Sequence, residues 1–206
     1  MTRQQIIDYV VAKMDEIHPT NQGETIQDKQ VETQLDASAV SLMEALPSVL
    51  ADPKTAVLTA NDLSDHIEGF SVTLKCPDDY IRLHRLKLND WIRPVTDLFP
   101  DGDRLLWQQD YDYIKSTKRR PAASIYHKDE RYYITCYPAI GEAPAVEEFV
   151  YVKKPAAAED IGDHLVELLA WKCAGHVFQV AGQFERTQAC EQRLGEIVQA
   201  KLKYRS

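Results

Sequence analysis

The sequence predicts an α+β fold in which N- and C-terminal helices form a helical bundle and an antiparallel β-sheet lobe is inserted between them. Apolar residues recur at helical spacing up to residue 46 and again from residue 159 to the end. Between these regions, segments that begin at Gly69 alternate apolar and polar residues, as strands with one buried face do. We therefore expect one continuous structural unit with three parts: helices at residues 1–68, a β-rich lobe at 69–154 and the remaining helices at 155–206.

Two helices are predicted in the N-terminal part. The first covers residues 2–17, where apolar side chains share one face: Ile6, Val10, Met14 and Ile17. The second follows a predicted capping box formed by Thr25 and Asp28. Its apolar stripe consists of Val31, Leu35, Leu42 and Leu46. A short polar link over residues 51–61 is expected to lead into the β-rich part.

Five strands are predicted in the β-rich part, at residues 70–76, 80–88, 124–127, 131–137 and 146–152. In the second strand the apolar phase slips between Leu83 and Leu86, which predicts a β-bulge near His84 and Arg85. Residues 128–130 are expected to form the turn of a hairpin between the third and fourth strands.

The helical period returns at Glu159 and continues to the end of the chain. A broad apolar stripe from Ile161 to Val180 predicts a helix with a wide buried face, which Gly182 breaks or bends before a last helix. A glycine inside a helix costs up to about 1 kcal/mol relative to alanine. Gly175 therefore indicates a close approach by another helix or subunit, or a simple kink.

The charge balance limits the classes of function. The chain has 206 residues and a net charge of −8, which disfavours a dedicated nucleic-acid-binding protein. An acidic protein can still surround DNA without gripping it, because a negative lining repels phosphates. No stretch approaches the roughly 20 apolar residues that span a bilayer, and the N-terminus lacks the apolar core of a signal peptide. We expect a soluble, intracellular protein with no membrane partner.

No residue set in the sequence predicts an enzyme. P-loop, Rossmann and nucleophile-elbow motifs are absent from the sequence. The four cysteines lack the C-x-x-C pairs of zinc sites and are expected to be small buried hydrophobes: Cys76, Cys136, Cys173 and Cys190. His164 and Glu167 share a helical face but have no complementary pair of ligands. The acidic residues Asp97, Asp101 and Asp103 lack the terminal Glu of a calcium loop. We predict no cofactor and no metal.

One dense basic cluster stands out, formed by Lys115, Lys118, Arg119 and Arg120 directly before Pro121. It is either a solvated turn or an anchor for a partner's carboxylates or a passing phosphate, because Arg presents a rigid fork of donors. Nearby aromatic residues are typical of interfaces, although each could equally lie in the core. The candidate interface consists of Trp91, Trp107, Tyr111, Tyr113, Lys118, Arg119 and Arg120.

The segments WIRPVTDLFP (91–100) and DRLLWQQDYDYIKSTKRRP (103–121) resemble structural proteins of Bacteroides-infecting phages, particularly the neck or ring proteins of crAss-like phages. The sharper match covers about residues 91–138. Over most of the chain, the layout is similar to the wider head-to-tail adaptor family of short-tailed phages.

This resemblance implies a structural virion protein of the neck or tail and not an enzyme. The protein would assemble as a ring of twelve copies around the DNA channel. It would contact the portal protein and further neck and tail ring proteins, and DNA would pass through the lumen without specific binding. It would reside in the virion, and in the host cytoplasm during assembly.

Contacts between neighbouring copies are expected to join the basic cluster to an acidic surface. Two acidic surfaces are candidates, the run from Asp97 to Asp103 and the pair Glu147–Glu148. Two other classes of function stay open. One is a small cytoplasmic enzyme or an enzyme subunit, with a pocket built from scattered residues such as His66, His84 and Asp110. The other is a non-viral interaction module such as a chaperone or regulatory partner.

Overall fold

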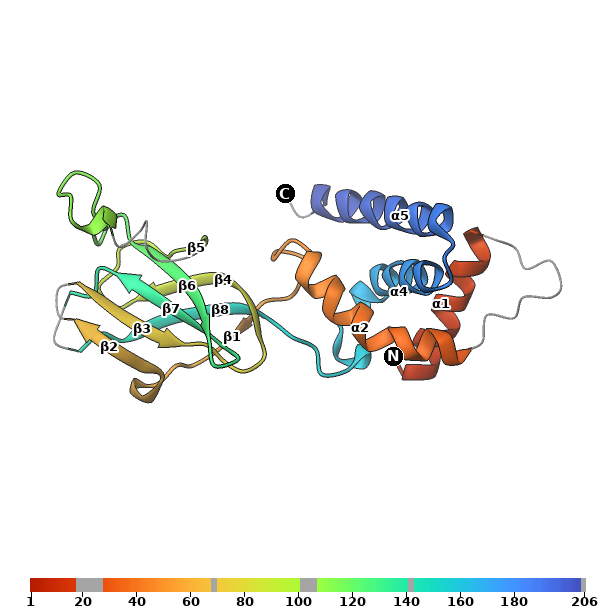
Figure 1. Cartoon of the computed structure of the whole chain (residues 1–206), viewed down its shortest axis with the longest axis horizontal. Coiled ribbons are helices and arrows are strands. Elements are labelled where there is room, and N and C mark those ends of the chain that lie inside the picture. The colour runs from red at the N-terminus through yellow and green to blue at the C-terminus, as the bar shows by residue number, and fades with distance from the viewer. Residues whose placement is uncertain (18–27, 68–69, 101–106, 141–142, 205–206) are drawn as a thin grey trace. The chain divides into compact units, whose positions relative to one another are not determined.

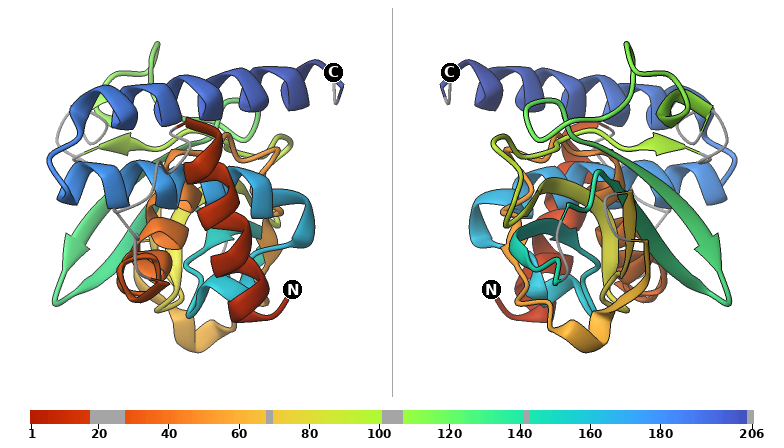
Figure 2. Two further views of the ribbon diagram at one scale, coloured as in Figure 1. Left: turned by 90° about the vertical axis from the view of Figure 1, so that its right-hand side faces the viewer. Right: turned by 90° about the vertical axis from the view of Figure 1, so that its left-hand side faces the viewer.

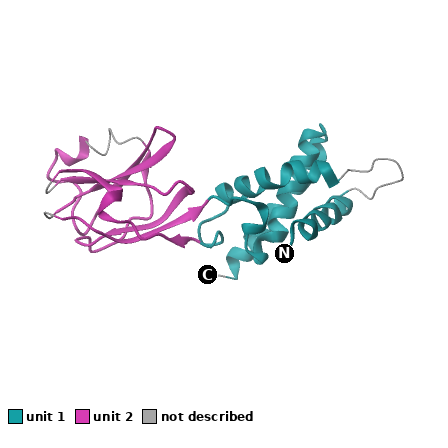
Figure 3. Ribbon diagram, turned by 90° about the horizontal axis from the view of Figure 1, so that it is seen from below, with its two compact units in different colours: residues 1–52, 154–206 teal, residues 53–153 magenta. Residues whose placement is uncertain are grey.

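The computed structural model describes residues 1–17, 28–67, 70–100, 107–140 and 143–204 (Figure 1). The chain divides into two compact units (Figure 3). The helical unit contains residues 1–52 and 154–206, and the β unit contains residues 53–153. The predicted fold class, terminal helices around an inserted antiparallel β region, is confirmed.

The first boundary lies earlier in the chain than the expected 68/69. Residues 54–67 belong to the β unit because they contain two strands, β1 (Lys54–Thr55) and β2 (Leu63–Ile67), which pair with strands from later in the chain. A 3-10 turn, η1 (Ala60–Asp62), joins them. The segment expected to be a polar link, residues 51–61, therefore contains strand β1 of the three-stranded sheet.

In the helical unit, α4 (Val166–Val180) packs against the three other helices of the described residues: α1 (Arg3–Ile17), α2 (Asp28–Ala45) and α5 (Phe184–Lys203). Ten of its fifteen residues are buried, because apolar and small residues occupy most of its circumference. Helix α5 lies beside α4 (Figures 1 and 2), and an added Cβ at Gly175 would lie 3.5 Å from the Cβ of Cys190. Gly175 thus marks a close approach between two helices.

Helix α4 starts at Val166, whereas the sequence predicted a helical segment from Glu159. Two 3-10 turns precede it, η2 (Ala158–Asp160) and η3 (Asp163–Leu165). The Asp160 carboxylate accepts hydrogen bonds from the backbone N–H groups of Ala156 and Ala157 at 3.0 and 3.1 Å, which fixes a turn there. The break predicted at Gly182 is confirmed, since this residue has φ +74° between α4 and α5. The capping box predicted at Thr25 and Asp28 involves a residue outside the described part of the chain.

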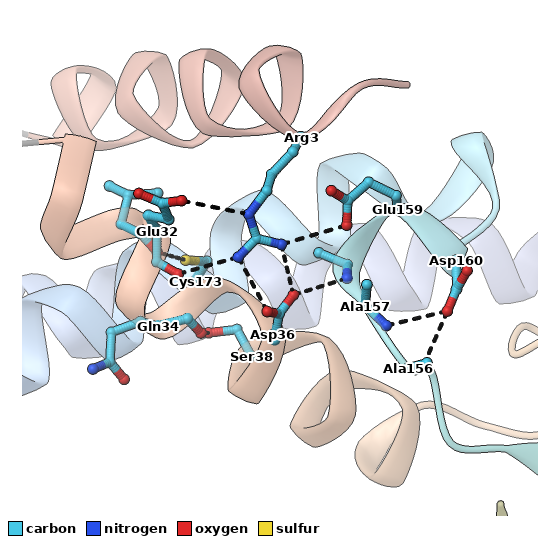
Figure 4. A network of polar contacts seen from close by, with 12 residues as sticks. Arg3, Glu32, Gln34, Asp36, Ser38, Ala156, Ala157, Glu159, Asp160 and Cys173 are labelled. Atoms are coloured by element: carbon cyan, nitrogen blue, oxygen red, sulfur yellow. Dashed lines mark hydrogen bonds and ion pairs between the residues drawn. The ribbon is translucent and has the colours of Figure 1, made fainter.

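A polar network joins the two chain segments of the helical unit (Figure 4). The guanidinium of Arg3 donates to both carboxylate oxygens of Asp36 at 2.9 and 3.0 Å, and it also pairs with Glu32 and Glu159. Asp36 accepts a further hydrogen bond from the backbone N–H of Ala158 at 3.0 Å. The Arg3 hydrogen bond, helped by Ala158, keeps the pKa of Asp36 below its usual value, although burial opposes this effect. One carboxylate therefore connects α1, α2 and the segment that leads to α4.

The β unit is built from two sheets whose inner faces share one core cluster. The first sheet has the order β1-β8-β4, with β8 (Val146–Lys153) and β4 (Tyr80–Leu88). The second has the order β2-β3-β7-β6-β5, with β3 (Ser71–Lys75), β7 (Arg131–Tyr137), β6 (Ala122–Lys128) and β5 (Phe99–Pro100). All neighbouring strands are antiparallel except β5 and β6. Apolar side chains from both sheets, among them Leu74, Leu86 and Phe149, fill the space between them.

Two local predictions in the β unit are confirmed. The register of β4 against β8 shifts between Leu83 and Arg85, where the bulge was expected. The hairpin turn between β6 and β7 contains Asp129 and Glu130, both with positive φ, as the favoured two-residue hairpin turns require.

We predict that residues 53–153 produced alone form a folded domain, because the two sheets close their own core. Residues 154–206 alone should not fold, since α4 would lose the helices that bury it. The dispersion of amide proton chemical shifts in NMR spectra and denaturant-induced unfolding of both fragments test this prediction. Cooperative unfolding of the 154–206 fragment, or its absence in the 53–153 fragment, would contradict the prediction.

A second prediction concerns the pH dependence of stability. Ser38 Oγ donates to the backbone oxygen of Gln34 at 2.7 Å and therefore accepts from Nδ1 of His176, 2.8 Å away. Burial lowers the pKa of His176, Lys172 lowers it further, and Glu191 opposes both. Because the folded pKa lies below the unfolded value of about 6.5, the unfolded state binds more protons, and stability falls as the pH drops through that value.

His176→Asn keeps a donor near Ser38 but cannot titrate. Between pH 7.5 and pH 5 this variant should lose less unfolding free energy than the wild type. Urea unfolding at several pH values measures the difference. Identical pH profiles would show that the imidazole does not contribute to the pH dependence.

Candidate functional site

The basic cluster forms a tight turn that projects Lys118 and Arg119. Thr117 and Arg120 exchange backbone hydrogen bonds at 3.1 and 2.9 Å, and the hydroxyl of Thr117 accepts a further bond from the N–H of Arg120. Ile92 N–H donates to the carbonyl of Lys118 at 2.8 Å and anchors the turn to the rest of the β unit. The side chains of Lys118, Arg119 and Arg120 are exposed. The backbone is thus held in place while the charged groups face outward.

An open groove of about 790 Å³ lies beside this turn. Its apolar lining comes from four residues in three separate segments: Phe70, Ile92, Pro138 and Ile140. Polar and charged residues from the region 109–119 complete it: Gln109, Lys115, Ser116, Thr117, Lys118 and Arg119. The groove therefore combines an apolar surface with a positively charged edge, and we call it the basic groove.

Hydrogen bonds fix the segments that line the groove. The indole Nε1 of Trp91 donates to the carbonyl of Pro138 at 2.8 Å, and a carboxylate oxygen of Asp90 accepts from Ile140 N–H at 2.9 Å. Gln109 Oε1 accepts from Ser116 N–H at 2.9 Å. A surface held in this way loses little conformational entropy when a partner binds.

Trp91 was expected at the interface, and the structure places it in the core. Only 2% of its surface is exposed, and its ring belongs to the cluster that both sheets bury. Its indole N–H, which needs an acceptor because it is buried, binds the carbonyl of Pro138 and so holds this residue in the lining of the groove. Direct contact between Trp91 and a partner is therefore not compatible with the fold.

The other three aromatic residues of the candidate interface lie at the surface. Trp107, Tyr111 and Tyr113 are 54%, 47% and 92% exposed, and the rings of Trp107 and Tyr111 are 4.7 Å apart. Ile114 in the same segment is 49% exposed. Large apolar groups that gather on a surface mark interaction sites more often than scattered ones do.

The charges of the turn are not neutralised within the described part of the chain. Lys115 pairs with Asp112 at 2.6 Å, whereas Lys118, Arg119 and Arg120 form no ion pair with any described residue. Cations that form no ion pair with the described residues are available to the carboxylates of another molecule.

Of the acidic groups expected to face this turn on a neighbouring copy, Glu147 and Glu148 already form ion pairs within their own chain. Glu147 pairs with Lys87 at 2.7 Å and Glu148 with Arg85 at 2.9 Å, across β8 and β4 of the same chain. They are therefore not the free acidic pair that the expectation required. Asp97 is exposed, and Asp101 and Asp103 lie outside the described residues.

The acidity of the chain is concentrated in the helical unit. That unit contains ten Lys and Arg against sixteen Asp and Glu, a net charge of −6. The β unit contains fourteen against sixteen, a net charge of −2. The basic groove thus lies on the less acidic of the two units.

The residues suggested for a scattered enzyme pocket do not come together. His66 lies on β2, His84 on β4 and Asp110 in an exposed turn, and no hydrogen bond or ion pair between described residues joins them.

The pair formed by Ser38 and His176 was not predicted from the sequence, because its members are 138 residues apart. It has the composition of a nucleophile and base, but Ser38 is completely buried and donates to its own helix, so a substrate cannot reach it.

The cysteines are buried, as predicted. Burial raises the pKa of Cys76 and Cys173 to about 12 and that of Cys190 to about 11, and it also raises the pKa of Cys136. These thiols are therefore poor nucleophiles at neutral pH.

Within the ranges that the structure describes, no group of three or more His, Cys, Asp or Glu side chains is arranged to hold a metal ion. His164, considered as a ligand together with Glu167, instead lies 3.1 Å from a carboxylate oxygen of Asp52. In the same ranges, no helix has the length and apolar character to cross a membrane.

Comparison with known proteins adds no relative: no family model matches the chain, and no match was found among curated proteins. The phage resemblance of residues 91–138 stays a prediction.

We predict that Trp91→Phe destabilises the β unit by about 1–3 kcal/mol, because the buried Pro138 carbonyl loses its donor. Tyr113→Ser is the matched control, since the side chain is 92% exposed and its loss should change stability by less than about 0.5 kcal/mol. Urea unfolding of the two variants measures both values. Equal stability of the two variants would contradict the placement of Trp91 in the core.

Proposed function

We propose that the chain is a structural virion subunit that forms a ring-shaped head-to-tail connector between a phage portal and the tail, around the DNA channel. One observation carries the proposal: an exposed basic turn without ion-pair partners among the described residues borders an apolar groove and exposed aromatic residues. This combination is typical of a surface built for protein contact. The basic turn and the exposed aromatic residues lie in the segment, residues 91–138, that resembles phage neck and ring proteins.

Assembly of an acidic subunit needs local charge complementarity. Copies with a net charge of −8 repel one another, so a basic surface that meets acidic groups of a neighbour favours the correct pairing. Rim ion pairs contribute about 0–1 kcal/mol each, and most of the affinity should come from apolar groups such as Trp107 and Ile92. Both side chains are more than half exposed.

The charge also fits the passage of DNA. A ring of acidic subunits presents a net negative field to phosphates, so DNA is not retained by electrostatic attraction. In this arrangement the basic turns face neighbouring proteins and not the lumen. The portal protein and further ring proteins are the expected neighbours above and below.

The proposal predicts that purified particles contain this chain in a one-to-one ratio to the portal protein, which quantitative mass spectrometry can measure. Arg119→Glu with Arg120→Glu should strongly reduce incorporation, because the changed turn repels acidic neighbours. High salt should partly reproduce this effect by screening.

The control is Lys54→Glu with Lys128→Glu, which makes the same change in charge at two other exposed positions of the β unit. Circular dichroism verifies that both variants fold. Absence of the chain from particles, or incorporation of the arginine variant at the wild-type level, would refute the proposed role.

A further inference from the structure

The corner between α4 and α5 presents large apolar side chains to solvent. Val180 and Phe184 are 73% and 68% exposed, and Glu185 beside them is also exposed. We call these three residues the apolar corner. Exposure of two large side chains at one tight turn is costly unless another surface covers them.

The backbone of the corner is fixed. Ala181 N–H donates to the carbonyl of Val177 at 3.0 Å, and Gly182 N–H to that of Gln179 at 3.0 Å. Gln183 N–H donates to the carbonyl of Phe178 at 2.9 Å, and the left-handed conformation of Gly182 reverses the chain. Phe184 is therefore presented from a rigid support, which reduces the entropy lost on binding.

Glu185 gives the corner itself a negative charge, and Lys29 of α2 lines the hollow next to Val180. Glu185 forms no ion pair with a described residue, whereas Arg186 is turned toward its own unit. Its Nη1 donates to Gln183 Oε1 at 2.6 Å, and its guanidinium lies 5.7 Å from the ring centre of Phe178. Tyr204 is also exposed in the helical unit, but Lys201 and Lys203 on the same last turn make that end positive. Among the described residues of the helical unit, only Phe184 combines an exposed aromatic ring with a neighbouring carboxylate that forms no ion pair.

We infer that the apolar corner of one copy binds in the basic groove of a second copy. Phe184 would contact the apolar lining at Ile92 and Ile140, and Glu185 would face Lys118 and Arg119. The inference rests on the proposed function and names the surface on the neighbour that the basic groove recognises. The two surfaces are complementary in two respects. Apolar side chains meet apolar side chains, and a carboxylate on the more acidic unit meets cations on the less acidic one, all without ion pairs among the described residues.

A contact between two different surfaces of the same chain is heterologous. Each copy uses its groove toward one neighbour and its corner toward the other, so the contact repeats and closes into a ring when the rotation permits. Every subunit in a closed ring is then held on two sides, which compensates for the small size of a single contact.

Two variants with complementary defects test this arrangement. Lys118→Glu with Arg119→Glu damages the groove, and Phe184→Asp damages the corner while placing an acidic residue at a helix N-terminus, where it is tolerated. Sedimentation velocity should show each variant as a monomer at concentrations at which the wild type associates. An equimolar mixture should contain one-to-one dimers and nothing larger, because one intact groove and one intact corner remain.

Disulfide trapping identifies the residues in contact. Phe184→Cys on one copy and Ile92→Cys on another should form an intermolecular disulfide, since the native cysteines are buried. Val57→Cys in place of Ile92→Cys is the control for random collision, because Val57 is 89% exposed on the same unit but does not line the groove, and it should form no comparable product. A chain that carries both Phe184→Cys and Ile92→Cys should give linked oligomers, and quantitative closure within a single chain would overturn the inference in favour of internal docking.

Absence of both the mixed dimer and the intermolecular disulfide also overturns the inference. If particles nevertheless hold the chain and the portal protein in equal numbers, the proposed connector role stands and the contact lies elsewhere. Competition distinguishes the possible occupants of the groove. A peptide of residues 178–190 should displace the second copy, whereas acidic peptides of other sequence and single-stranded DNA should not.

Discussion

Burial of α4 between helices from both ends of the chain is the interaction on which the helical unit depends. Most of the circumference of α4 is apolar or small, so it can be covered only if α1, α2 and α5 surround it. The network around Asp36 supports this packing, because a single carboxylate accepts from Arg3 and from the backbone at Ala158. These groups are partly exposed, so the network orients the segments more than it stabilises them.

The insertion of the β unit is compatible with this packing because of one strand pair. Strand β1 begins the unit and β8 ends it, and they are antiparallel neighbours with Lys54 opposite Tyr151. The chain therefore enters and leaves the β unit at adjacent positions. The whole β unit can therefore be inserted between α2 and α4 without separating the two chain segments of the helical unit.

Local signals in the sequence predicted the local features well. The slip in apolar phase in β4, the hairpin at Asp129 and the break at Gly182 all depend on residues close to one another in the chain. The strands β1, β2 and β5 were missed, because two have only two residues and β2 is largely exposed and polar. Such strands form because they pair with neighbouring strands, and their own residues carry little strand signal.

The site was predictable in part. The basic turn was found from composition, but Trp91 and Trp107 could not be told apart, since the burial of Trp91 depends on a carbonyl 47 residues away. The ion pairs of Glu147 and Glu148 were not foreseen, because they depend on the pairing of β4 with β8. The register places Lys87 opposite Glu148, and the ion pairs form with the neighbouring positions. The groove itself was not accessible to sequence reasoning, because its lining comes from segments that meet only in the folded β unit.

The division of the helical unit between the two ends of the chain has a consequence during synthesis. The ribosome releases α1 and α2 first, and the whole β unit follows before α4 emerges. At a translation rate of about 5–20 residues per second, the apolar faces of α1 and α2 wait for several seconds without their main partner. In that interval the β unit has time to fold, while the nascent N-terminal helices are exposed to chaperones and to other nascent copies. Co-translational folding of this protein therefore begins in the middle of its chain and ends with its termini.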